Sequence, residues 1–202
     1  RKCGSRYSVD TMKYIVDPSL SEIAFDVSHL MFSSVHGKFT RFAGEVNFTS
    51  NQTGEAPELM TEGSFIEIEA SSLESGLGTS ADKKATSTFE ADKFPVMKCT
   101  PIGLPLCATE LSAKKCFKTV GQVLIRDVTQ DVEFEVTVDG NSFGDDMLKV
   151  HVLASIDRLA FGVCPNWPTL ALGQQITLQA ALVGRLESKR EDEPNAEQVQ
   201  GA

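Results

Sequence analysis

The stretch that decides the fold is Val132-Glu133-Phe134-Glu135-Val136-Thr137-Val138, in which apolar and polar residues alternate. Successive side chains of a β-strand point to opposite faces, so a period of two predicts a strand with one buried and one solvated face. An amphipathic helix would instead place apolar residues three or four positions apart. The fold class then depends on how often this period recurs along the chain.

The same alternation recurs at residues 23–29, 66–69 and 176–182, and further strand-like runs occupy residues 38–48, 94–100, 121–126 and 147–157. Turn-forming residues, such as Asp139-Gly140-Asn141, separate these runs. A helix is favoured only over residues 80–91. About eight antiparallel strands are predicted. They either form two stacked sheets or close into a barrel, whose interior would hold side chains or one slender ligand.

The composition limits the classes of partner. The chain has 202 residues, of which 41% are hydrophobic and 23% charged, which suits one globular domain. Twenty-eight acidic against nineteen basic residues give a net charge of -9, which argues against nucleic acid as a partner. Twelve phenylalanines indicate either a filled core or the lining of an apolar cavity. The sequence contains no run of eighteen apolar residues, so no membrane-spanning helix is predicted.

The five cysteines are Cys3, Cys99, Cys107, Cys116 and Cys164. Their spacing does not suit a zinc site, so no metal is predicted. Cys107 and Cys116 are the preferred disulfide candidates. Free thiols, a Cys99–Cys107 bridge, or a bridge from either residue to Cys164 remain alternatives. A disulfide would indicate an oxidising compartment.

Catalytic motifs are missing from the sequence. It contains no Gly-x-Ser-x-Gly elbow, no phosphate-binding P-loop and no His-Glu-x-x-His helix. Residues 1–12 and 187–202 are expected to be tails, and the second, which is charged, is expected to be disordered. We therefore expect a non-enzymatic protein with its domain at residues 13–186.

Four segments, in the same order along the chain, resemble the YceI-like family of polyisoprenoid-binding proteins. They are residues 14–44, which begin Tyr14-Ile15-Val16-Asp17-Pro18; Asp92-Lys93-Phe94-Pro95; residues 121–129, from Gly121 to Thr129; and Ile156-Asp157-Arg158-Leu159-Ala160-Phe161-Gly162. The resemblance covers roughly residues 13–186.

This resemblance implies an all-β fold: an elongated, eight-stranded antiparallel barrel, lipocalin-like, with one or two short helices. It also implies that the pore binds an isoprenoid lipid, either an isoprenoid quinone such as ubiquinone or a polyprenyl phosphate or pyrophosphate, and that no other cofactor is required. Family members are usually periplasmic or secreted and often occur as homodimers. Contact with a membrane surface or a redox protein would allow lipid exchange.

The strand faces and the resemblance together predict the ligand-binding residues. They are Phe25, Val27, His29, Met31, Phe39, Phe42, Ile66, Ile68, Phe89, Phe94, Met97, Ile125, Phe134, Val136, Ile156, Arg158, Phe161 and Trp167. His29 and Arg158 are candidates for contact with a polar head group, as is Arg41, because imidazole and guanidinium groups suit a carbonyl or a phosphate. The alternatives are a satisfied core histidine and, for Arg158, a structural clamp on neighbouring carbonyls or carboxylates.

The leading hypothesis is therefore non-catalytic binding of one isoprenoid lipid, for transport, storage or presentation. Two alternatives remain open at this point. One is a structural β-module whose interior is packed shut. The other is a thiol-redox protein that uses Cys99, Cys107 and Cys116.

Overall fold

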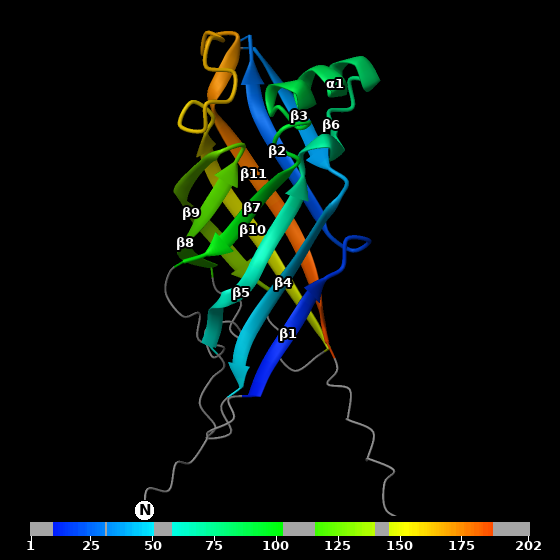
Figure 1. The fold of residues 1–202 in the computed structure, drawn as a ribbon, viewed down its shortest axis with the longest axis vertical. Coiled ribbons are helices and arrows are strands. Elements are labelled where there is room, and N and C mark those ends of the chain that lie inside the picture. The colour runs from blue at the N-terminus through cyan, green and yellow to red at the C-terminus, as the bar shows by residue number, and fades with distance from the viewer. Residues whose placement is uncertain (1–9, 31, 51–57, 103–115, 140–145, 188–202) are drawn as a thin grey trace, which may run out of the picture.

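The computed structural model describes residues 10–30, 32–50, 58–102, 116–139 and 146–187, which form an elongated antiparallel β-barrel with one helix (Figure 1). The strands are β1 (Asp10–Val16), β2 (Glu22–His29), β3 (Ser33–Phe39), β4 (Phe42–Ser50), β5 (Glu58–Glu69), β6 (Leu73–Glu74), β7 (Val96–Pro101), β8 (Cys116–Ile125), β9 (Val128–Val138), β10 (Met147–Asp157) and β11 (Leu172–Leu186). The helix α1 spans Thr79–Thr88, and a 3-10 turn, η1, spans Ala70–Ser72.

The barrel closes because β1 pairs with β4 on one side and with the end of β11 on the other. Three long strands of the barrel are each interrupted once and so appear as two elements. The interruptions are residues 17–21 between β1 and β2, Thr40-Arg41 between β3 and β4, and η1 between β5 and β6. Counted in this way, eight antiparallel strands pair in chain order around the barrel. The expected eight-stranded barrel is thereby confirmed, and the sandwich alternative is excluded.

The period of two predicts the burial along β9 correctly. Val132, Phe134, Val136 and Val138 are all at most 8% exposed, whereas Glu133 and Glu135 lie on the outer surface. The buried residues pack with inward side chains from the other strands into one apolar cluster. The interior of the barrel is therefore the hydrophobic core of the domain.

The observed elements differ from the expected runs at several of their ends. β1 begins at Asp10, three residues inside the expected tail at residues 1–12, because residues 10–15 find hydrogen-bonding partners in β4. The run at residues 38–48 is two strands, since the chain turns a corner at Thr40-Arg41. Residues 1–9 and 188–202 of the expected tails lie outside the described residues.

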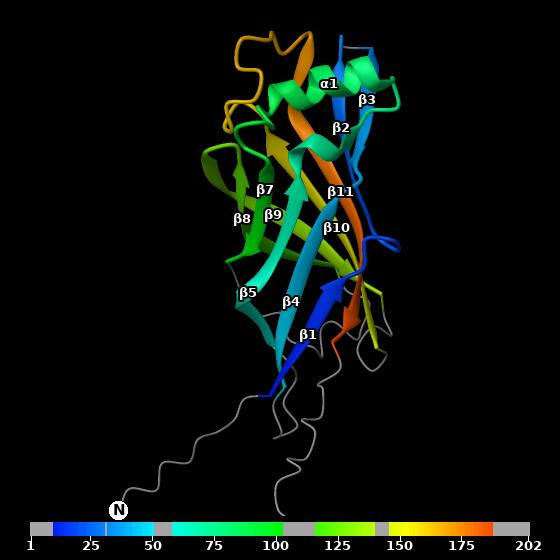
Figure 2. The same cartoon turned by 45° about the vertical axis from the view of Figure 1, so that its right-hand side comes forward.

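The helix α1 lies across one end of the barrel, beside β3 and β6, and the loop between β10 and β11 lies at the same end (Figures 1 and 2). Asp82 attaches the helix to its preceding loop by accepting hydrogen bonds from the backbone N–H and the hydroxyl of Ser75, at 2.7 and 2.6 Å. No helix of the described ranges is long and apolar enough to cross a membrane.

Candidate functional site: two apolar cavities in the barrel

Among the described residues, two cavities lie end to end in the barrel interior, with volumes of about 210 Å³ and about 100 Å³. We call the larger one the lower cavity and the smaller one, nearer α1, the upper cavity. Four residues line both of them: Ile68, Cys99, Phe134 and Leu178. The two cavities therefore share one wall, and together they suit an elongated ligand better than a round one.

These volumes are large enough to accept a ligand. An apolar cavity of about 150 Å³ in a protein core stays dry and binds benzene, and the lower cavity is larger than that. Well-packed protein interiors contain few voids larger than a water molecule. The alternative of a structural β-module whose interior is packed shut therefore does not fit the described residues.

Many of the predicted ligand-binding residues line these cavities. Ile66, Ile68, Phe134 and Val136 line the lower cavity. The upper cavity is lined by Phe25, Phe39, Ile68, Phe89, Met97, Ile125, Phe134 and Ile156. Phe89 directly follows α1, so the helix places one aromatic ring at the end of the upper cavity. Ligand contact by these residues stays a prediction.

Other predicted residues lie away from the cavities. Val27, Phe42 and Phe161 are buried, at 6%, 9% and 2% exposure, and the two phenylalanines belong to the apolar core cluster, but none of the three lines a cavity. His29 is the last residue of β2, is half-buried, and is not among the residues that line either cavity. Met31 lies outside the described residues.

Phe94 and Trp167 contact cations instead of lining a cavity. The ammonium group of Lys93 lies 4.7 Å from the ring centroid of Phe94, and that of Lys84 lies 5.5 Å from the Trp167 ring. Trp167 is 40% exposed in the loop between β10 and β11. Both residues follow turns and lie outside the strands, so the alternation of strand faces does not predict where their rings point.

Arg158 is a clamp on backbone carbonyls and does not reach either cavity. Its side chain is 1% exposed, and its Nε donates to the carbonyl of Gly173 at 2.9 Å. The two Nη atoms donate to four further carbonyls, those of Val163, Cys164, Trp167 and Leu172, at 2.6 to 3.0 Å. The guanidinium therefore holds the β10–β11 loop. This agrees with the alternative that Arg158 is a structural clamp.

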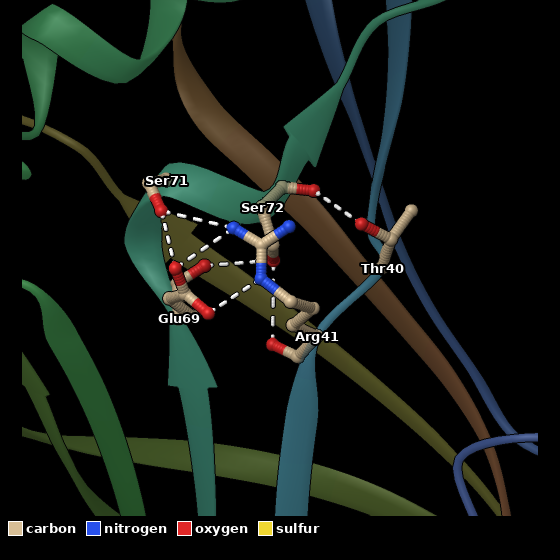
Figure 3. Close-up of polar contacts among 5 residues, drawn as sticks. All are labelled: Thr40, Arg41, Glu69, Ser71 and Ser72. Carbon is tan, nitrogen blue, oxygen red and sulfur yellow. Dashed lines mark hydrogen bonds and ion pairs between the residues drawn. The ribbon is translucent and has the colours of Figure 1, made fainter.

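Arg41, the remaining head-group candidate, is also engaged (Figure 3). Its Nε and Nη2 donate to the two carboxylate oxygens of Glu69 at 2.5 and 2.8 Å, and Ser71 donates to the same carboxylate at 2.6 Å. These bonds hold the pKa of Glu69 at about 2, well below its usual value. The ion pair joins the corner between β3 and β4 to the end of β5.

Several cavity residues escape the sequence prediction, mainly in the lower cavity. Tyr14 is 2% exposed there and packs edge-on against Phe48, with ring centroids 5.9 Å apart. Burial raises the pKa of the Tyr14 phenol. Other residues missed are Leu59, Phe65, Thr119, Leu148 and Leu182. Alternation along β10 and β11 could have found Leu148 and Leu182, but Leu59 precedes a bulge that breaks the period.

Polar groups in the cavity walls are few. Glu45 is paired with Lys13 at 3.1 Å, and Lys98 is paired with Glu67 at 2.8 Å. The hydroxyl oxygen of Thr119 is buried and has no hydrogen-bond partner among the described residues. A buried, unpaired hydroxyl is unfavourable by about 1–3 kcal/mol, so this atom is suited to bind a polar atom of a ligand.

The cysteines of the described ranges, Cys99, Cys116 and Cys164, are free thiols. Cys116 is exposed and donates to Glu135 at 3.1 Å. Its expected disulfide partner, Cys107, lies outside the described residues. Burial raises the pKa of Cys99 to about 11, so its thiol stays protonated near neutral pH. Within the described part of the chain, no group of three or more His, Cys, Asp or Glu residues could hold a metal ion.

Solved structures share this barrel. The chain is similar to BcnA from Burkholderia cenocepacia, with a TM-score of 0.67 and 19% identity over 83% of this chain and 98% of that one. It is also similar to a polyisoprenoid binding domain from Saccharophagus degradans implicated in plant cell wall breakdown, with a TM-score of 0.62 and 12% identity over 86% and 98% of the two chains. The YceI protein of Campylobacter jejuni gives a TM-score of 0.59 and 20% identity over 80% and 90%.

Sequence comparison gives the family directly. No curated protein sequence matches the chain at a significant level. The family model for the YceI-like domain, however, matches residues 14–184, which is nearly the whole barrel from β1 to β11. The resemblance in the strand segments is therefore confirmed, and the chain belongs to the YceI-like family.

Proposed function

We propose that the barrel binds the apolar chain of one isoprenoid lipid along its two cavities and catalyses no reaction. The observation that carries the proposal is the shared wall of Ile68, Cys99, Phe134 and Leu178, which places two apolar cavities in series. A prenyl chain is slender, apolar and elongated, so its shape and chemistry match this interior. The Saccharophagus degradans domain, which is named for polyisoprenoid binding, supports the same ligand class.

Burial of apolar surface alone supplies enough affinity for such a ligand. Each buried methylene contributes about 0.8 kcal/mol, so a five-carbon unit contributes about 4 kcal/mol. Two or three buried units reach about 8–12 kcal/mol before the entropy of ordering the chain is subtracted. This range corresponds to dissociation constants near 1 μM to 1 nM at most. No charged contact is needed.

The contacts of the polar groups argue against the alternatives. In the described cavity walls the one carboxylate, Glu45, is bound by Lys13, so it does not form a general acid–base pair. The raised pKa of Cys99 disfavours the thiolate that redox chemistry requires. We therefore favour binding, for transport, storage or presentation of the lipid, over thiol-redox activity.

The head group and the compartment belong to the same proposal. The unpaired hydroxyl of Thr119 in the lower cavity suits the neutral carbonyl oxygen of a quinone, whereas a polyprenyl phosphate would keep its charged group outside the apolar walls. We propose that the protein is periplasmic or secreted and takes its lipid up from a membrane. A homodimer is the oligomeric state to be tested. Cell fractionation and sedimentation equilibrium test the compartment and the assembly.

Organic extraction of the purified protein, followed by mass spectrometry, tests the function. We expect an isoprenoid in about one-to-one ratio, or saturable binding when a quinone or a polyprenyl phosphate is added to the delipidated protein. Ala180→Phe, which fills the lower cavity, should abolish binding. Ala181→Phe is the matched control, because the next residue of β11 does not line a cavity. Absence of binding by the wild type, or equal binding by both variants, would overturn the proposal.

A further inference from the structure

Large apolar side chains are exposed at the end of the barrel that carries α1. Phe32 is 95% exposed in the turn between β2 and β3, and Leu30 in the same turn is 58% exposed. In the loop between β10 and β11, Leu170 is 63% exposed and Trp167 is 40% exposed. We call these four residues the apolar rim. Both views of the fold show the tips of β2 and β3, this loop and α1 at one end (Figures 1 and 2).

The parts of the apolar rim adjoin one another. The backbone N–H of Leu30 donates to the carbonyl of Ala171 at 3.2 Å, which joins the β2–β3 turn to the β10–β11 loop. Lys84 of α1 lies over the ring of Trp167. Arg158 holds the loop from inside through its five carbonyl contacts. These contacts therefore hold the two loops that carry the exposed side chains next to each other.

The rim is also free of charge in its own segments. Residues 27–35 and 159–173 contain no Asp, Glu, Lys or Arg, although 23% of the chain is charged. Other exposed apolar residues, such as Leu153 and Val96, lie singly on strands whose neighbours include charged residues. A contiguous exposed apolar patch indicates an interaction site, and the missing charges remove the main cost of entering a nonpolar phase.

The geometry points to a lipid membrane as the partner: we propose that the apolar rim docks the α1 end of the barrel on a membrane surface. The apolar rim consists of four side chains on two loops, whereas a stable protein partner needs about 800 Å² of contact on each side. A lipid surface adapts to such a shape. Tryptophan is enriched at the boundary between lipid and water, and lysine also serves as an anchor there, where Trp167 and Lys84 would lie.

This docking deepens the proposed lipid function and rests on it. Phe89, which follows α1, lines the upper cavity. A barrel docked by its apolar rim thus brings the upper cavity toward the membrane from which a prenyl chain would come. The chain could then pass from one apolar environment to another near α1, with little exposure to water.

Trp167 provides a direct test, since it is the single tryptophan of the chain. The full-length protein would be mixed with phosphatidylcholine vesicles that contain no isoprenoid, with and without 20% phosphatidylglycerol. The expected results are a shift of Trp167 emission to shorter wavelength and co-flotation of the protein with the vesicles. Phe32→Ser combined with Leu170→Ser should weaken vesicle partitioning by about tenfold or more. Leu153→Ser, on the outer face of β10, is the matched control and should leave partitioning unchanged.

Three outcomes would overturn the docking proposal: no emission shift and no flotation by the wild type, equal loss in the control variant, or loss of a dimer in place of loss of vesicle binding. Sedimentation of each variant identifies the last outcome. Binding of a short, soluble prenyl alcohol without vesicles tests the cavities separately. If this binding persists while vesicle docking fails, the docking is wrong and the proposed function stands; the reverse result rejects the proposed function.

Discussion

The ring of Phe134 lies against Gly121 on the neighbouring strand, so closely that a Cβ atom at position 121 would come within 2.8 Å of Cε2 of the ring. Phe134 lines both cavities, and this contact allows its ring to lie near the wall of the barrel. A glycine on β8 therefore helps to keep open the region in which the two cavities meet. Gly121 does this because it has no side chain that would occupy the space of the Phe134 ring.

Gly121→Ala should narrow this region, because the added methyl group forces the Phe134 ring away from β8. We expect a loss of stability of about 1–3 kcal/mol, as is usual for overpacked cores. Long prenyl chains that need both cavities should lose more affinity than short chains that fit one. Urea denaturation and titration with chains of two lengths measure these effects. Adding Phe134→Leu should restore both the stability and the affinity for long prenyl chains. Failure of this rescue would contradict the steric explanation.

Arg158→Met should destabilise the protein strongly, since five backbone carbonyls lose their common donor. Loss of a buried charged donor typically lowers the free energy of unfolding by about 3 kcal/mol or more. Hydrogen exchange should show the greatest loss of protection in residues 159–171. Arg158→Lys, which keeps the charge but can reach fewer carbonyls, should be intermediate. Unchanged protection in that loop would contradict the clamp.

The sequence predicts the walls of this barrel better than its cavities. Alternation along β9 places its buried residues correctly, because burial of one strand face depends on local pattern alone. Closure into a barrel follows from the family resemblance, since sandwiches and barrels share the same period. The cavities depend on contacts between distant residues, such as Gly121 with Phe134, which no local pattern records.

The polar candidates show a second limit. Chemistry alone makes Arg158 and Arg41 suitable for a phosphate, but the fold supplies carbonyls to the first and a carboxylate to the second. Thr119, with an unpaired hydroxyl in the lower cavity, has no sequence signal that separates it from other strand threonines. Which polar side chains remain available is decided by tertiary structure.

Glu69→Gln should alter the acid stability of the protein. The pKa of Glu69 falls from 4.5 to about 2 on folding, first because of Arg41 and then because of Ser71. A lowered pKa stabilises the folded state above the unfolded value, and this stability is lost as the pH falls from about 4.5 towards 2. The difference in unfolding free energy between wild type and Glu69→Gln should therefore be constant near neutral pH and shrink in this range. Ser71→Ala should show a smaller effect of the same sign, and parallel curves for all three proteins would contradict the assignment.

Cys99 should resist alkylation in the folded protein. With a pKa of about 11, about a thousandth of its thiol is ionised at pH 8, whereas Cys116 is exposed and serves as the internal reference. Mass spectrometry of peptides after treatment with N-ethylmaleimide should show Cys116 labelled first. Bound lipid should slow the labelling of Cys99 further, because this residue lines both cavities. Equal rates at the two cysteines would show that the interior is open to water.

Thr119→Val should separate recognition of the head group from recognition of the chain. Valine has nearly the shape of threonine but no hydroxyl, and the hydroxyl oxygen of Thr119 is buried without a partner in the described structure. Removing it should leave the ligand-free protein equally stable or more stable by up to about 1 kcal/mol. Binding of a quinone should weaken by about fivefold to tenfold, the loss of one hydrogen bond, while binding of a prenyl hydrocarbon of the same length stays constant. Calorimetric titration of both ligands measures this difference. An equal loss for both would mean that Thr119 contacts the chain and that the polar end binds elsewhere.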